Sequence, residues 1–274
     1  MVFIPSLINP PRVLDLSHSR SMLRHMAAAG HDAYLVDWGT PLAEDQDLSL
    51  AGHVSERLLP LLSILPRPPL LVGYCLGGTI ALAAAMLRSV AGLATIASPW
   101  RFDGFPQEDR DRIAALWRVS KPLCERLGYV PMEVLQSGFW AIDPARTIRR
   151  YATFADMEEG SDAALALLAL EDWANEGPPL TFAAGCELFE QLYGADITGT
   201  GQWRVRGLPV TPDLLTVPSL AIGSTTDRIV PAEASPPLDD LMRLELGHVG
   251  MVIGGRARDT LWEPLSRWVS THGG

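Results

Sequence analysis

The sequence predicts an α/β fold in which a mostly parallel sheet of about six strands is flanked by helices. Short apolar runs alternate with stretches of helical periodicity near both ends of the chain, which is the order expected when helices connect parallel strands. The chain has 274 residues, of which 47% are hydrophobic and 20% charged. A chain of this size and composition can build one large core, with or without an insertion.

The individual elements follow from these runs. Strands are expected at residues 2–8, 33–38, 70–74, 93–96, 219–223 and 241–246. Helices of the core are expected at residues 19–29, 53–64, 79–87 and from about 257 onward. Gly30 ends the first of these helices, as glycine commonly does. The last helix carries Leu261, Leu265 and Trp268 at helical spacing, an apolar stripe that is typical of core contacts.

The alternation of strands and helices stops between about residues 100 and 215. Helices are predicted there at residues 108–127, 145–155, 161–174 and 183–193, with no clear new parallel strand. An insertion between the fourth and fifth core strands lies over the carboxyl edge of the sheet. We therefore predict a core of residues 1–99 and 216–274, and a helical cap of residues 100–215 inserted before the last two core strands. An independent helical domain is the alternative, but neither end offers a clear flexible linker.

Cys75 lies at the centre of the motif Gly-Tyr-Cys-Leu-Gly-Gly at residues 73–78. An apolar, strand-like run leads into the motif and a helix-forming run leads away from it. Strand, Gly-x-nucleophile-x-Gly, helix is the nucleophile elbow of the α/β-hydrolase fold, here with a thiol as the nucleophile. Glycines are needed because side chains beside the nucleophile would collide with the neighbouring strand and helix. The N-terminus of the following helix favours a thiolate.

Two simpler explanations of this run are available. Free cysteine is often a buried structural residue, although the glycines on both sides favour a nucleophile. No charge falls between Arg67 and Arg88, a span that approaches the length of a membrane crossing. The three glycines at its centre favour a buried strand feeding a packed helix. The sequence therefore predicts no transmembrane segment.

A thiol nucleophile needs a base, and the base needs an orienting carboxylate. In the α/β-hydrolase fold these residues follow the order nucleophile, acid, histidine along the chain. Asp227 follows the expected strand 219–223, and His248 follows the expected strand 241–246. Both are therefore predicted to meet Cys75 at the carboxyl edge of the sheet. Asp103 is a rival for the carboxylate, and Asp37 is a weaker one.

Only six histidines are present, which keeps the search for the base short. The five besides His248 precede the elbow or lie in the terminal tail, and they are His18, His25, His31, His53 and His272. The oxyanion hole is expected to use the backbone N–H of Leu76 and a second N–H after the first strand, at Ile8 or Asn9. Equally, we expect that the Asn9 side chain only shapes that loop.

Composition excludes several function classes. A net charge of −10 argues against a general nucleic-acid binder. The three cysteines, Cys75, Cys124 and Cys186, cannot all pair, and their spacing suits neither zinc nor a disulfide scaffold. No phosphate loop, dinucleotide fingerprint or metal cluster occurs, so neither a cofactor nor a metal is predicted. The first residues do not match a signal peptide, and a cytoplasmic protein is expected.

The predicted cap holds two sets of residues with a possible role in substrate binding. Its basic residues suit either the phosphates of coenzyme A or, more commonly, a solvated helix face, and they are Arg110, Arg112, Arg118, Arg146, Arg149 and Arg150. Its apolar residues suit either a pocket lining or, more commonly, a core, and they are Trp117, Leu135, Phe139 and Trp140.

Seven stretches of the chain together resemble the polyhydroxyalkanoate (poly-3-hydroxybutyrate) synthases. The likeness is greatest to the shorter synthases, which work with a second subunit. These stretches are residues 7–9, 14–16, 35–39, 73–79, 173–178, 227–231 and 247–251. They occur in order and span nearly the whole chain. The chain departs from the family in two respects: it begins almost at the first core strand, as a short form without most of the N-terminal region, and Arg228 replaces the usual histidine after the acid.

The resemblance implies an activity and a role for each matched residue. Cys75 would take a 3-hydroxyacyl group from coenzyme A as a thioester and pass it to the hydroxyl end of a growing polyester. His248 would be the general base, and Asp227 would orient it. The implied substrate is an acyl-CoA or a polyester, the implied partner is a second synthase subunit or a second copy in a homodimer, and the location is the cytoplasm or a polyester granule.

Two other functions fit the same residues. A cysteine hydrolase, acting as an esterase, thioesterase or polyester depolymerase, needs the same three residues and differs only in using water as the acceptor. A binding or granule-associated relative without catalysis would retain the three residues unused. Product size after incubation with hydroxybutyryl-CoA separates the first two, and the absence of any turnover would indicate the third.

Overall fold

The protein, described here by a computed structural model over residues 1–142, 157–158 and 160–272, is built on a six-stranded sheet. The strand order is β12-β11-β6-β5-β1-β4, and every neighbouring pair is parallel. These strands are β1 (Val2–Ile4), β4 (Tyr34–Leu35), β5 (Leu70–Tyr74), β6 (Gly92–Ile96), β11 (Ser219–Ser224) and β12 (Asp240–Leu244). The predicted α/β fold with a parallel sheet of six strands is confirmed.

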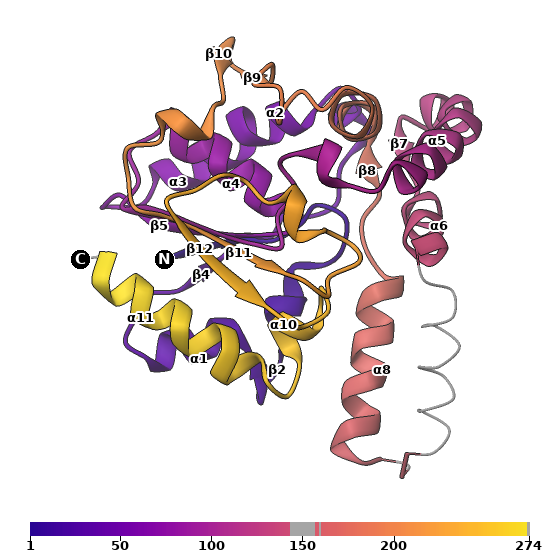
Figure 1. Cartoon of the computed structure of the whole chain (residues 1–274). Coiled ribbons are helices and arrows are strands. Elements are labelled where there is room, and N and C mark those ends of the chain that lie inside the picture. The colour runs from indigo at the N-terminus through magenta and orange to yellow at the C-terminus, as the bar shows by residue number, and fades with distance from the viewer. Residues whose placement is uncertain (143–156, 159, 273–274) are drawn as a thin grey trace.

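Helices cover both faces of the sheet (Figure 1). One face carries α2 (Leu50–Gly52), η3 (His53–Leu58), α3 (Leu59–Ser63) and α4 (Leu76–Leu87). The other face carries α1 (Met22–Ala28), α10 (Gly250–Ile253), η8 (Arg258–Trp262) and α11 (Glu263–His272). Because successive side chains of a strand point to opposite faces, Leu71 of β5 packs into the first layer, whereas Val72 and Tyr74 pack into the second.

The first strand and the first helix are shorter than the sequence predicts. A strand was expected over residues 2–8, but β1 ends at Ile4, because Pro5 has no N–H to donate to a neighbouring strand. The helix expected at residues 19–29 begins at Met22. Its start is displaced by a small hairpin of β2 (Asp15–Ser17) and β3 (Arg20–Ser21). The Ser21 side chain then caps α1 by accepting the Arg24 N–H at 2.9 Å.

The chain between β6 and β11 is largely helical. Its described helices are α5 (Gln107–Leu127), α6 (Met132–Ile142), α8 (Asp162–Asn175), α9 (Phe182–Cys186) and η5 (Glu187–Gly194). Two short antiparallel ladders, β7 (Tyr129–Val130) with β8 (Leu180–Thr181) and β9 (Arg204–Val205) with β10 (Leu208–Pro209), also lie here. None of these described strands joins the large sheet. The helix α6 was not predicted, and the helix expected at residues 145–155 lies outside the described residues.

Helices α5, α6 and α8 lie to one side of the sheet and its covering helices (Figure 1). Hydrogen bonds join this segment to the core and also brace it internally. The indole of Trp173, in α8, donates to the Pro10 carbonyl at 2.8 Å. The buried Glu187 carboxylate accepts the Ala51 N–H at 3.1 Å and the Trp203 indole N–H at 2.5 Å. These bonds join α8 and η5, in the middle of the segment, to the core.

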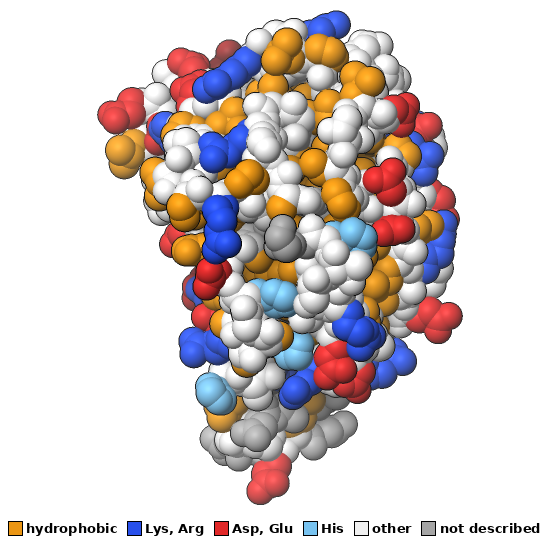
Figure 2. Space-filling view, turned by 90° about the vertical axis from the view of Figure 1, so that its left-hand side faces the viewer, with side chains coloured by type: hydrophobic (Ala, Val, Ile, Leu, Met, Phe, Trp, Pro, Cys, Tyr) orange, Lys and Arg blue, Asp and Glu red, His pale blue; other side chains and the backbone are white. Residues whose placement is uncertain are grey.

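The surface carries charges of both signs. On the face shown in Figure 2, acidic and basic side chains are interspersed among apolar ones, without a large field of one sign. Among the described helices, none combines the length and the apolar character needed to cross a bilayer.

Candidate active site

Cys75 occupies a strained turn between β5 and α4. Its backbone angles are φ 54° and ψ −132°, a conformation that a non-glycine residue adopts only when its surroundings impose it. The surroundings are tight. A Cβ on Gly77 would lie 2.2 Å from the Ile4 carbonyl oxygen, and a Cβ on Gly73 would lie 2.3 Å from the Gly78 Cα. The glycines of the motif are therefore required by close backbone approach, as the sequence predicts.

The sheet order explains why a pocket forms beside this turn. The chain runs outward from β1 to β4, and then returns to build β5, β6, β11 and β12 on the other side of β1. Ligands of open parallel sheets bind beyond the carboxyl ends of the strands where the order reverses, which here lies between β1 and β5. Cys75 follows β5 and Ile8 follows β1, and both line one pocket.

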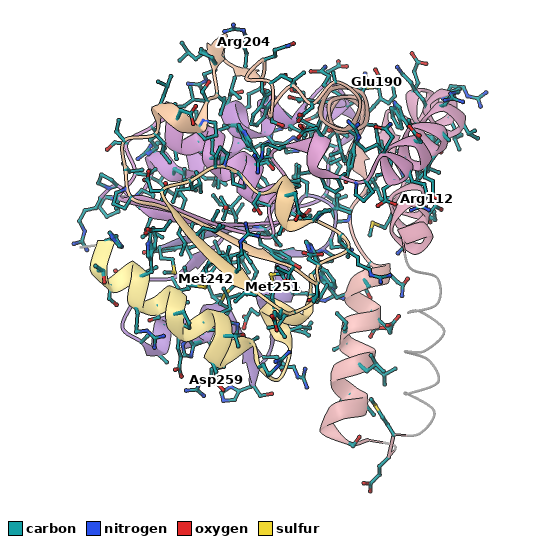
Figure 3. All side chains as sticks on the ribbon, viewed as in Figure 1. Arg112, Glu190, Arg204, Met242, Met251 and Asp259 are labelled. Carbon is teal, nitrogen blue, oxygen red and sulfur yellow. The ribbon has the colours of Figure 1, made fainter. Side chains whose placement is uncertain are left out.

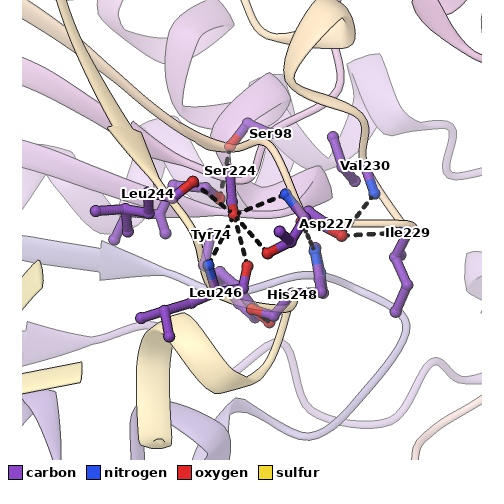
Figure 4. Close-up of polar contacts among 11 residues, drawn as sticks. Tyr74, Ser98, Ser224, Asp227, Ile229, Val230, Leu244, Leu246 and His248 are labelled. Atoms are coloured by element: carbon purple, nitrogen blue, oxygen red, sulfur yellow. Dashed lines mark hydrogen bonds and ion pairs between the residues drawn. The ribbon is translucent and has the colours of Figure 1, made fainter. Parts of the chain in front are cut away.

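His248 and Asp227 meet at the same edge of the sheet. His248 Nδ1 lies 2.7 Å from Asp227 Oδ2, and both side chains are almost fully buried. The other carboxylate oxygen, Oδ1, accepts the N–H groups of Ile229 at 2.8 Å and Val230 at 3.1 Å (Figure 4). Because an ionised carboxylate can only accept, it fixes the proton of neutral His248 on Nδ1 and leaves Nε2 as the acceptor. The Cys75 side chain is close enough to His248 to influence the pKa of its imidazole.

Two residues that the sequence did not single out hold His248 in place. The Ser224 hydroxyl, at the end of β11, accepts the Leu246 N–H at 3.0 Å and donates to the Leu246 carbonyl at 2.6 Å (Figure 4). The Tyr74 hydroxyl donates to the His248 carbonyl at 3.3 Å, and the two rings lie 5.2 Å apart. A signal for Tyr74 was available, since it sits inside the elbow motif; Ser224 had none.

The buried imidazole is strongly biased toward its charged form. Burial alone lowers the pKa of His248, but the Asp227 carboxylate and the Cys75 thiolate, with their hydrogen bonds, outweigh it and raise the pKa to about 10. Burial and the charges of Cys75 and Asp227 raise the pKa of Tyr74 well above its ordinary value, so the phenol stays protonated. The imidazolium is therefore a favourable form of His248 in this site.

The rival carboxylates lie elsewhere. Asp103 is exposed in the short helix η4 (Phe102–Gly104), and the exposed Asp37 accepts the Gly39 N–H at 2.9 Å. Among the described residues, Asp227 is the carboxylate hydrogen-bonded to His248. Two of the other histidines bond residues away from this site: His53 bonds the Ser49 carbonyl at 2.8 Å, and His31 bonds Ser266 at 3.1 Å.

The three backbone groups expected to bind an oxyanion differ in their partners. Leu76 is the first residue of α4 and lines the pocket, and an N–H at this position has no partner within its helix. The Ile8 N–H donates to the Ser6 hydroxyl at 3.2 Å and is therefore engaged. The Asn9 side chain donates to the carbonyls of Trp173 and Ala174, each at 3.4 Å, so it ties its loop to α8.

The pocket above Cys75 is partly open. Its lining is apolar and comes from both the core and the segment between β6 and β11. The described lining residues are Ile8, Cys75, Leu76, Pro99, Phe102, Ile113, Leu116, Val134, Leu135, Gly138, Leu188, Phe189, Tyr193, Ile229 and Val230. A pocket with such an apolar lining suits an acyl chain.

Of the apolar residues expected in this lining, Leu135 lines the pocket. Trp117 is buried beside it instead, stacked on Phe189 with ring centres 4.7 Å apart. The side chains of Phe139 and Trp140 lie outside the described residues.

The basic residues of the same segment differ in their surroundings. Arg110 and Arg112 bond Gln107 and Asp109 of their own helix, α5, and Arg112 lies on the side of the molecule where the α5 and α6 helices are (Figure 3). Arg118 is exposed, and Arg146, Arg149 and Arg150 lie outside the described residues. No group of three His, Cys, Asp or Glu side chains in the described part of the chain is arranged to hold a metal ion.

The model of the alpha/beta hydrolase family matches residues 1–256. The chain belongs to this family. Solved structures agree on the fold: a monoacylglycerol lipase of Paleococcus ferrophilus superposes with a TM-score of 0.57 over 99% of this chain and 93% of the lipase, at 13% identity.

Similar sequences are polymerases. The chain is 26% identical to the poly(3-hydroxyalkanoate) polymerase subunit PhaC of Haloarcula marismortui, over 98% of this chain and 60% of the relative. It is 24% identical to the protein of the same name from Allochromatium vinosum, over 98% of this chain and 80% of the relative. The chain thus spans about three-fifths of the length of the first of these relatives. The resemblance to polyhydroxyalkanoate synthases seen in the sequence is confirmed.

Proposed function

We propose that this protein is an acyltransferase of the polyhydroxyalkanoate synthase type, in which Cys75 carries a 3-hydroxyacyl group between coenzyme A and a hydroxyl acceptor. The observation that carries the proposal is the buried, hydrogen-bonded pair of His248 and Asp227 close to Cys75, which lines an apolar pocket. A thiol paired with a buried imidazole is an activated nucleophile, and the pocket offers an acyl chain a place beside it.

Acylation of Cys75 follows from this geometry. His248 Nε2 takes the thiol proton, and Asp227 stabilises the imidazolium that results. The thiolate attacks the thioester carbonyl, whose oxygen becomes an oxyanion held by the Leu76 N–H and by a second N–H of the loop after β1. When the oxyanion collapses, the bond to the coenzyme A sulfur breaks. The imidazolium gives its proton to the departing thiolate, and Cys75 is left as a thioester.

Transfer reverses the roles of the two partners. A hydroxyl group enters, His248 takes its proton, and the oxygen attacks the Cys75 thioester. Collapse of the second oxyanion forms an oxygen ester and frees the Cys75 thiolate, which regains a proton from His248. An apolar lining supports transfer over hydrolysis because it disfavours water near the thioester.

The comparisons support this assignment and extend it to partners. The relatives are named polymerase subunits, which supports a shared acyl-CoA substrate and an assembly with a second subunit or a second copy. The same relatives support a location at polyester granules. The hydrolases among the solved structures share the fold and carry no further argument about the acceptor.

Intact-protein mass spectrometry tests the proposal directly. After brief exposure to 3-hydroxybutyryl-CoA, the wild type gains one 3-hydroxybutyryl mass and releases coenzyme A, whereas Cys75→Ala does neither. Cys186→Ala, which removes another half-buried cysteine, keeps the adduct and serves as the matched control. An adduct on Cys75→Ala would refute the assignment. Product size then separates acceptors: oligomers support transfer to a hydroxyl, while free 3-hydroxybutyrate alone would make the protein a thioesterase.

A further inference from the structure

Tyr193 is, besides Cys75, the only polar side chain among the described residues that line the pocket. Its ring belongs to η5, on the segment that covers the elbow. The contacts recorded for this side chain are with aromatic rings, and its hydroxyl makes no hydrogen bond to any described residue. Tyr193 is half-buried, so its hydroxyl stays available to a molecule that enters the partly open pocket.

The ring is held in a fixed position. Phe102 packs against it edge-on with ring centres 4.8 Å apart, and Phe105 does so at 5.2 Å. Phe102 is itself anchored, because its N–H donates to the buried Asp196 carboxylate at 2.8 Å. Tyr193 therefore cannot easily swing its hydroxyl to a new partner elsewhere in the protein.

The Tyr193 hydroxyl stays protonated and can donate a hydrogen bond. Burial first, and then the negative charges of Cys75 and Asp109, raise the pKa of Tyr193 above its ordinary value. The phenol consequently remains protonated beside the thiolate. In the empty pocket, water can satisfy this group. An acyl chain that fills the pocket displaces that water, and an unsubstituted chain leaves the phenol without any partner, which is costly.

We propose that the Tyr193 hydroxyl hydrogen-bonds the hydroxyl substituent of the acyl group, and so selects hydroxyacyl over unsubstituted acyl thioesters. This inference rests on the proposed acyl transfer and adds a specificity-determining residue to it. A site built to bond a substrate hydroxyl discriminates strongly against the analogue that lacks it, because its own polar group is then left unpaired. The other side chains of the lining, apart from that of Cys75, are apolar.

The test compares two thioesters of equal chain length, 3-hydroxybutyryl-CoA and butyryl-CoA, on the wild type and on Tyr193→Phe. The readout is the rate constant for acylation of Cys75, followed by coenzyme A release and by intact mass. The ratio of the two rate constants is expected to fall about tenfold to a hundredfold in Tyr193→Phe. Tyr129→Phe removes a hydroxyl from a partly exposed ring on β7, and it is expected to leave the ratio at the wild-type value.

Each other outcome overturns the inference in a recognisable way. An unchanged ratio in Tyr193→Phe means that the phenol does not recognise the substituent. An equal loss with both thioesters means that it acts on the carbonyl group or on the shape of the pocket, which near-ultraviolet circular dichroism distinguishes. If the wild type is acylated by neither thioester, the proposed function itself fails, and the inference fails with it.

Discussion

Replacing Asp227 by asparagine tests the link between the carboxylate and His248 while the loop around them keeps its hydrogen bonds. Oδ1 of Asp227 accepts the N–H groups of Ile229 and Val230, and the carbonyl oxygen of an asparagine can accept both. The amide nitrogen of the asparagine then faces His248 Nδ1, at the position of the oxygen that now lies 2.7 Å away. The substitution is thus isosteric and local.

The change reverses the tautomer of His248. An amide N–H₂ donates, so Nδ1 must become the acceptor and the ring proton moves to Nε2. Nε2 can then no longer take the proton of Cys75, and an imidazolium would face the amide without a balancing negative charge. Both effects weaken the general base rather than the nucleophile or the pocket.

The size of the effect follows from the pKa of His248. Its rise from 6.5 to about 10 occurs against the opposing effect of burial, and it corresponds to roughly 5 kcal/mol in favour of the imidazolium. The carboxylate and the thiolate share this stabilisation. Loss of the carboxylate, with the wrong tautomer that follows, is expected to lower the acylation rate by about 10²- to 10⁴-fold.

The assay is single-turnover release of coenzyme A with excess enzyme, combined with circular dichroism to verify the fold. Asp103→Asn is the matched control. Asp103 is an exposed carboxylate in η4, which follows β6, the fourth core strand along the chain. It is expected to retain the wild-type rate within about twofold. A wild-type rate in Asp227→Asn, or a large loss in Asp103→Asn, would refute the role given to Asp227.

Three further predictions concern stability. Because Cys75 has a positive φ of 54°, Cys75→Gly is expected to be more stable than Cys75→Ala by about 1 kcal/mol in urea denaturation; equal stabilities would argue against strain at the elbow. Because the pKa of His248 is raised from 6.5 to about 10, folded His248 keeps a proton that the unfolded chain has lost in this range, so the free energy of unfolding falls as pH rises through it, and His248→Gln should flatten that slope. Gly77→Ala brings a Cβ to 2.2 Å from the Ile4 carbonyl and is expected to cost more than about 3 kcal/mol or prevent folding, whereas Gly255→Ala, with nothing within 4 Å, should change stability by less than about 0.5 kcal/mol.

The sequence predicts those parts of the molecule in which local pattern and backbone geometry coincide. The strand at residues 70–74 matches β5 in full, because its side chains are buried on both faces and the glycine turn marks its end. The edge strand was overestimated: residues 33–38 were expected, and β4 spans Tyr34–Leu35. A strand at the edge of a sheet has one neighbour and is partly exposed, so apolar periodicity says little about where its pairing ends.

The segment between β6 and β11 shows what local pattern leaves out. Its long helix at Gln107–Leu127 was predicted almost to the residue, yet the sequence did not indicate which of its side chains would line a pocket. That depends on the packing of α5 against η5, where Trp117 bonds Glu190 at 2.7 Å and Tyr193 turns toward the elbow. Such contacts join residues more than seventy positions apart, and no periodicity records them.

The second oxyanion donor shows how a local side chain can decide a catalytic detail. Position after β1 made Ile8 and Asn9 equal candidates, because either N–H lies in the loop beside the elbow. The Ser6 hydroxyl accepts the Ile8 N–H at 3.2 Å, while the Asn9 side-chain amide donates to carbonyls of α8. A backbone N–H that is already satisfied gains little from a developing negative charge. The bond to Ser6 therefore weighs against the Ile8 N–H as the second donor, and it comes from a serine only two residues upstream.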